Sequence, residues 1–129
     1  MSQPKWLRLE ALLILHEEGL AEHGGLAGIR DQGLLESALE SPKNKAYYEP
    51  ESDMFVLAAT YSHAIAKNHP FFDGNKRAAF LAAATFLAVN GFSLEAGEAD
   101  ATLKVLALAA SEIDIADFAA WLRESSDEI

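Results

Sequence analysis

The chain has no cysteine among its 129 residues, and this absence removes several kinds of chemistry at once. It can form neither a disulfide framework nor a zinc–cysteine site, and it has no thiol nucleophile. A reducing cytoplasm fits such a composition best. Prolines and glycines are also few, four and eight, while half of the residues are hydrophobic. A chain of this size and composition is expected to fold as one domain over residues 1–129.

Long hydrophobic runs are also absent. The longest apolar run, Ala78 to Val89, is much shorter than the roughly 20 residues that cross a bilayer as a helix. The first residues, Met-Ser-Gln-Pro-Lys-Trp, lack the basic-then-apolar pattern of a signal peptide. We therefore expect a cytoplasmic protein without a membrane partner.

Positive charge is scarce, with 10 lysines and arginines against 20 acids and a net charge of −10. This balance argues against direct nucleic-acid binding, which depends on cations that meet phosphates. The sign of the net charge reverses locally, because residues 67–77 hold three cations (Lys67, Lys76 and Arg77) and one acid, Asp73. A basic spot on an acidic protein is typical of a small-anion site.

Apolar residues recur at helical spacing along most of the chain, which predicts an all-α fold of about six helices around a buried central helix. Aspartates 31, 53 and 114 stand where N-caps are expected. The predicted helices cover residues 6–22, 31–41, 53–68, 78–89, 98–110 and 115–124. Helix 78–89 is apolar on every side, so we expect it to be buried on every side. A short extended piece is expected around residues 92–94 or in the tyrosine-containing loop described next.

Residues 42–52 are polar and bounded by prolines, which predicts a loop that begins where Ser41-Pro42 ends the second helix. Tyr47 and Tyr48 lie within this stretch. They can stack on a nucleotide base or a target protein, or they can fold back onto the core. The sequence favours neither alternative.

The segment His69-Pro-Phe-Phe-Asp-Gly-Asn-Lys-Arg77 holds a base, a carboxylate, a glycine, an amide and two cations directly before the apolar helix. The start of a helix has free backbone N–H groups and the positive end of the dipole, and both favour an anion. The pattern predicts nucleotide chemistry at this helix start.

Each polar residue of the segment suits a part of that chemistry. A neutral His69 imidazole can take a proton from a hydroxyl near neutral pH. Asp73 can hold Mg²⁺ together with substrate phosphates, or cap the helix, or do both. Gly74 lets a phosphate approach the main chain closely. Asn75 can orient a phosphate oxygen or cap the helix.

The two cations, Lys76 and Arg77, can stabilise charge during phosphoryl transfer. Phe71 is interpreted as an anchor that holds the loop on the core.

Other histidines give weaker patterns. His63 and His69 are six residues apart and poorly spaced for a shared metal on one helix face. His16 and His23 are seven apart and have no zinc signature, and His16 falls on the apolar face of the first helix. The chain also contains no nucleophile-elbow serine and no Walker-type glycine loop.

The 69–77 segment resembles the signature loop of the Fic/Doc family, and more narrowly that of its Doc toxins. Support comes from residues 25–36, the helix that ends at Asn90-Gly91, and residues 113–122. The resemblance implies that His69 is the base for a target hydroxyl and Asp73 the Mg²⁺ ligand. It implies that Gly74, Asn75, Lys76 and Arg77 bind the phosphates of ATP.

Two departures from the Fic pattern point towards Doc. Fic adenylyltransferases typically have glycine where Lys76 stands and a second arginine where Phe80 stands. Doc toxins share both departures; by this resemblance the γ-phosphate of ATP passes to a threonine of elongation factor Tu, which stops translation. Gly74 matches the Fic form, where some Doc proteins have alanine, so AMP transfer to a hydroxyl remains an alternative.

The resemblance also bears on partners. The chain has no Ser/Thr-x-x-x-Glu inhibitory helix of the kind found in many Fic proteins, so inhibition is expected from a separate Phd-like antitoxin whose amphipathic helix enters an apolar groove. A further alternative is a catalytically silent binding module, which a broken motif would favour; this motif is whole.

Overall fold

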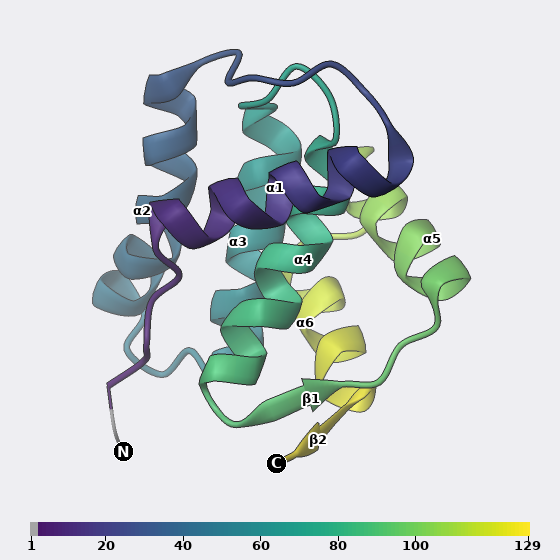
Figure 1. Cartoon of the computed structure of the whole chain (residues 1–129). Helices are drawn as coiled ribbons and strands as arrows, with labels where there is room; N and C mark the ends of the chain where they lie inside the picture. Colours follow the sequence, from purple (N-terminus) through teal and green to yellow (C-terminus); the bar gives the residue numbers. More distant parts are fainter. Residues whose placement is uncertain (1–2) are drawn as a thin grey trace.

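The computed structural model describes residues 3–129, so the first two residues of the predicted domain lie outside the described residues. Within that range the chain forms six helices and one two-stranded sheet, which confirms the predicted helical class (Figure 1). The elements are α1 (Leu9–His23), α2 (Gln32–Tyr48), α3 (Met54–Asn68), α4 (Asn75–Val89), β1 (Phe92–Leu94), α5 (Glu98–Ala109), α6 (Ile115–Glu124) and β2 (Ser126–Glu128). None of these helices is long and apolar enough to cross a membrane.

The three predicted aspartate N-caps are confirmed. Asp31 accepts a hydrogen bond from the N–H of Leu34, and Asp53 accepts one from the N–H of Val56, both at 2.9 Å. Asp114 and Asp117 form a reciprocal capping box at the start of α6. Each cap satisfies donors that the first turn of a helix leaves unpaired, so local sequence fixes where α2, α3 and α6 begin.

Two helices share the centre of the molecule. Helix α3 packs against α2, α4, α5 and α6, and α1 crosses over α4 (Figure 1). The sequence alone does not reveal how deeply α3 is buried, because this helix contains polar hydroxyl residues that are nevertheless buried in the structure. Thr60 bonds to the carbonyl of Val56 at 2.8 Å, and Ser62 bonds to the carbonyl of Ala79 on α4 at 2.6 Å. Burial of these polar groups is tolerated because each has a partner.

Helix α4 is central but is not buried on every side, contrary to the sequence prediction. Its buried face carries alanines and two large residues, Phe86 and Leu87. Phe80 and Leu81 are half-buried, and Val89 is exposed. The many alanines make every face look apolar in the sequence, but its neighbours α1, α3, α5 and β1 do not surround the helix completely.

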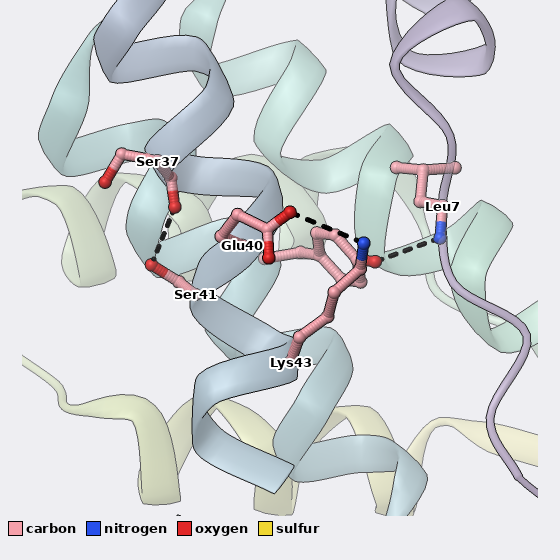
Figure 2. A network of polar contacts seen from close by, with 6 residues as sticks. Leu7, Ser37, Glu40, Ser41 and Lys43 are labelled. Carbon is pink, nitrogen blue, oxygen red and sulfur yellow. Dashed lines mark hydrogen bonds and ion pairs between the residues drawn. The ribbon is translucent and has the colours of Figure 1, made fainter. Parts of the chain in front are cut away.

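The predicted loop over residues 42–52 is wrong at its start, because α2 continues through Pro42 to Tyr48. A proline in a helix cannot donate to the carbonyl four residues before it and usually costs about 3 kcal/mol. Here its ring is fully buried in the core, so packing offsets that cost. Side chains also connect the turns around it: Ser41 donates to the Ser37 carbonyl at 3.1 Å, and Lys43 lies 3.5 Å from Glu40 (Figure 2).

Two short strands, β1 before α5 and β2 after α6, form an antiparallel pair. Phe92 pairs with Glu128 and Leu94 with Ser126. The extended piece at residues 92–94 is therefore confirmed. Its partner was not predicted, because Ser-Asp-Glu has little intrinsic preference for strands.

Tyr61 ties the N-terminal segment to the core. Its hydroxyl accepts a hydrogen bond from the buried N–H of Leu7 at 2.9 Å, a contact drawn in Figure 2. Burial raises the pKa of Tyr61 from 10.0 to about 12, and the nearby charge of Glu40 adds to this rise against the opposing Leu7 hydrogen bond. The folded state therefore holds the phenol proton more tightly than the unfolded chain does.

We predict that Tyr61→Phe lowers the free energy of unfolding by roughly 1–2 kcal/mol, because the Leu7 N–H loses its acceptor. The raised pKa adds a pH dependence. The stabilisation that this raised pKa contributes is complete below pH 10.0 and is lost as pH rises through about 12. Because Tyr61→Phe has no phenol to ionise, the variant should lose less stability over this pH range than the parent. Urea unfolding at several pH values measures both effects. Tyr47→Phe, at an exposed position, should keep the parental pH dependence; an identical pH dependence in the parent and Tyr61→Phe would contradict the prediction.

Candidate active site

The polar segment 69–74 forms the loop that joins α3 to α4. In Figure 1 this loop lies at the same end of the molecule as the long connection between α1 and α2. The two segments are hydrogen-bonded. The Pro70 carbonyl accepts from the N–H groups of Arg30 and Asp31 at 2.7 and 3.1 Å, and Ile29 pairs with Phe71 in an isolated β-bridge. The backbone of the loop is therefore fixed by a segment about 40 residues away in the sequence.

His69 begins the loop at the C-cap of α3 in the left-handed conformation, with φ 53° and ψ 54°. Arg30 stabilises this unusual backbone: its side chain donates to the carbonyl of His69 at 2.7 Å and to that of Asn68 at 2.9 Å. A cation at the C-terminal end of a helix is also favourable for the helix dipole. The His69 side chain is exposed, so a hydroxyl of another molecule can reach its imidazole.

Phe71 is fully buried, as its interpretation as a loop anchor requires. Its main chain is held by Asn75, whose side-chain oxygen accepts from the Phe71 N–H and whose side-chain nitrogen donates to the Phe71 carbonyl, both at 2.9 Å. Asn75 is only 3% exposed. Its side chain thus shapes the loop, and what it can offer to a phosphate is its backbone N–H.

Gly74 is the N-cap of α4. It has φ 79°, a region that residues with a side chain rarely adopt, and no side chain among the described residues caps this helix start. The first amides of α4 are therefore left for another acceptor. An uncapped helix N-terminus preceded by glycine is well suited to an anion.

Asp73 lies beside this helix start with an exposed carboxylate. One of its oxygens accepts from the N–H of Leu26 at 2.6 Å, which orients the group. Among residues 3–129, no three His, Cys, Asp or Glu side chains come together as a metal site. A single oriented carboxylate is compatible with Mg²⁺, which commonly uses one or two carboxylates together with substrate phosphates and water.

The two cations of the motif occupy the first turn of α4. Lys76 is exposed, and Arg77 forms an ion pair of 3.0 Å with Glu98 on α5. Such partly exposed pairs contribute little to stability, so Arg77 can exchange this carboxylate for a phosphate at small cost. Both cations border a cavity of about 390 Å³ between α4 and α5, which is lined in part by Phe80 and Val105.

Tyr47 and Tyr48 lie elsewhere. They are at the C-terminal end of α2, whereas the N-terminal end of α2 adjoins the motif loop. The 15 helical residues between these two ends of α2 correspond to roughly 22 Å. Both rings are more than three-quarters exposed and pack edge to face with centroids 5.0 Å apart. The alternative that they fold back on the core is wrong. They do not belong to the motif site, and a contact with a target protein remains a prediction.

Sequence reasoning missed three groups that shape this site: Arg30, the backbone of Leu26, and His16. The sequence places His16 on the apolar face of the first helix without a role in the loop, yet its ring stacks on Phe71 and its Nε2 lies 2.7 Å from the Asp73 carbonyl. The partners are 57 residues apart in the chain. The signal in the sequence that could have pointed to His16 is its position as a polar residue on the apolar face of the first helix.

The structure is a helical domain in which a polar loop enters an uncapped helix start, an arrangement suited to an anion. Comparison with known sequences identifies the family. Residues 6–87 match the sequence profile of the Fic/DOC family. The chain belongs to this family.

The chain is similar to two Doc proteins. The chain is 37% identical over 114 residues to "Protein kinase doc" of Escherichia phage P1, an alignment that covers 88% of this chain and 90% of the relative. It is 39% identical over 79 residues to "Toxin Doc" of Mycolicibacterium smegmatis (strain ATCC 700084 / mc(2)155), covering 60% and 61%. Both relatives are Doc proteins, in agreement with the resemblance found in the motif.

We predict that Asn75→Ala lowers the free energy of unfolding by about 2–3 kcal/mol, because it leaves the buried N–H and carbonyl of Phe71 without partners. Chemical denaturation measures this loss. Asn44→Ala, on α2 and away from the loop, serves as the amide-deletion control. Equal stability of the two variants would show that the Asn75 contacts contribute nothing.

Proposed function

We propose that this protein is a Doc-type toxin that transfers the γ-phosphate of ATP to a threonine or serine hydroxyl of a target protein. The observation that carries the proposal is the uncapped start of α4 beside an exposed histidine. The likeness to a protein named as a kinase supports phosphoryl transfer in particular.

The phosphates of ATP would bind where α4 begins, on the backbone N–H groups that follow Gly74. Helix-start amides stabilise anions through direct hydrogen bonds and through the helix dipole. Lys76 and Arg77 add positive charge at the same place, and Arg77 would leave Glu98 to do so. Mg²⁺, held by Asp73 and the phosphates, would supply charge neutralisation.

In the transfer step, neutral His69 takes the proton of the target hydroxyl. The hydroxyl oxygen forms a bond to the γ-phosphorus as the bond between that phosphorus and the β–γ bridging oxygen breaks, and ADP leaves. Catalysis then consists of positioning and electrostatic stabilisation, which is what a fixed loop and an uncapped helix provide.

Two partners complete the proposal. The target is elongation factor Tu, so that transfer stops translation, and the inhibitor is a separate Phd-like antitoxin whose amphipathic helix occupies an apolar groove. The absence of an inhibitory Ser/Thr-x-x-x-Glu motif from the chain and the names of the relatives support this arrangement.

AMP transfer is the second candidate, and Gly74 favours it. A glycine at φ 79° fits the Fic form of the motif. A silent binding module is a weaker candidate, because every polar residue of the motif is present.

We predict that purified protein transfers label from γ-³²P-ATP, and not from α-³²P-ATP, to elongation factor Tu. His69→Ala should abolish the transfer because no base remains to take the hydroxyl proton, while the far-ultraviolet circular dichroism stays unchanged. His63→Ala is the matched control, since His63 lies on α3 outside the loop, and it should keep activity. Transfer of α-label would establish AMP transfer instead. No transfer and no binding of Mg-ATP would favour the silent module.

A further inference from the structure

His16 is a buried polar side chain that the proposed transfer step does not use. It projects from α1 and is 5% exposed. Its imidazole lies parallel to the ring of Phe71, with centroids 3.7 Å apart and planes inclined by 9°. Its Nε2 lies 2.7 Å from the backbone oxygen of Asp73. One side chain thus contacts two residues of the motif loop.

The contact with Asp73 determines which ring nitrogen carries hydrogen. A carbonyl oxygen can only accept a hydrogen bond, so the Nε2 of His16 must donate. A histidine that merely filled space against Phe71 would need no such donor. The hydrogen bond is therefore a second, directional contribution in addition to the stacking.

This hydrogen bond fixes the direction of a neighbouring amide. The peptide bond between Asp73 and Gly74 is trans, as are all those described in the chain, so its carbonyl and N–H point in opposite directions. Since the carbonyl points to His16 on α1, the N–H of Gly74 points away from α1. The His16 ring also lies against Gly74 itself: a Cβ there would be 3.4 Å from Nε2.

Asn75 and His16 act on different parts of the loop. The Asn75 side chain holds the N–H and carbonyl of Phe71. His16 holds the Asp73 carbonyl, directly before the helix start. Without a donor at position 16 the Asp73–Gly74 peptide can rotate, because its carbonyl no longer has a buried partner.

We propose that His16 is a positioning residue that orients the Asp73–Gly74 peptide so that the Gly74 N–H faces the bound phosphate. The inference rests on the proposed function, since it assigns the phosphate of ATP to that amide. It places the control of phosphate binding partly on α1, outside the signature loop.

Two substitutions separate the hydrogen bond from the ring stacking. His16→Gln keeps an N–H donor near the position of Nε2 but removes the ring, whereas His16→Phe keeps the ring but removes the donor. We expect His16→Phe to raise the calorimetric dissociation constant of Mg-ATP roughly tenfold, the effect of losing one hydrogen bond to a charged group. His16→Gln should stay within about threefold of the parent. A residue that acts only by packing would give the reverse order.

A measurement without nucleotide tests the positioning alone. The nitrogen resonances of His16 should show hydrogen on Nε2, and the Gly74 amide resonance should move in His16→Phe and return towards its parental position in His16→Gln. His63→Gln, a half-buried histidine on α3, is the control and should change neither the resonance nor the affinity.

The outcomes distinguish the two proposals. If the parent binds no Mg-ATP, the proposed function fails, while the resonances still test the orientation of the peptide. If the parent binds and His16→Phe binds equally well with an unmoved Gly74 resonance, the positioning role is overturned. The positioning role is also overturned if His16→Gln binds Mg-ATP more weakly than His16→Phe does.

Discussion

The structure depends on one constraint: the chain must pass from α3 into α4 without capping the helix it enters. Three of the six described helix starts are closed by their own aspartate, at Asp31, Asp53 and Asp114. The start of α4 has Gly74 in that position and no side-chain cap. No side chain of the described residues caps this helix start, so the loop before α4 is held by other contacts and the first amides of α4 are left for another acceptor.

Distant parts of the chain hold that loop. The segment around Arg30 binds the backbone at His69 and Pro70, the Leu26 N–H orients the Asp73 carboxylate, and His16 holds the Asp73 carbonyl. These contacts come from α1 and from the connection that follows it. The geometry of the site is therefore a property of the packed domain as well as of the motif, whose own Asn75 and Phe71 also hold the loop.

The difference between local features and contacts from distant segments explains what could be predicted from the sequence. N-caps and helical spacing are local, so most helix boundaries and the overall class followed from the residues, as did the polar loop itself. The helix through Pro42 could not be predicted, because its proline is accommodated by burial in the tertiary structure. The same is true of β2, which depends on its pairing with β1, and of His16, whose role arises from a contact across 57 residues. The sequence also does not reveal how deeply α3 is buried, because Ser62 finds its hydrogen-bond partner, the Ala79 carbonyl on α4, only in the folded core.

The central claim is that the start of α4 binds the phosphates of ATP. A crystal structure of the parent protein with Mg²⁺ and a non-hydrolysable ATP analogue tests it most directly. The account predicts phosphate oxygens within hydrogen-bond distance of the amides of residues 74–77, with the metal beside Asp73 and His69 facing the terminal phosphate. A nucleotide bound elsewhere, or a helix start closed by protein groups while nucleotide is bound, would contradict it.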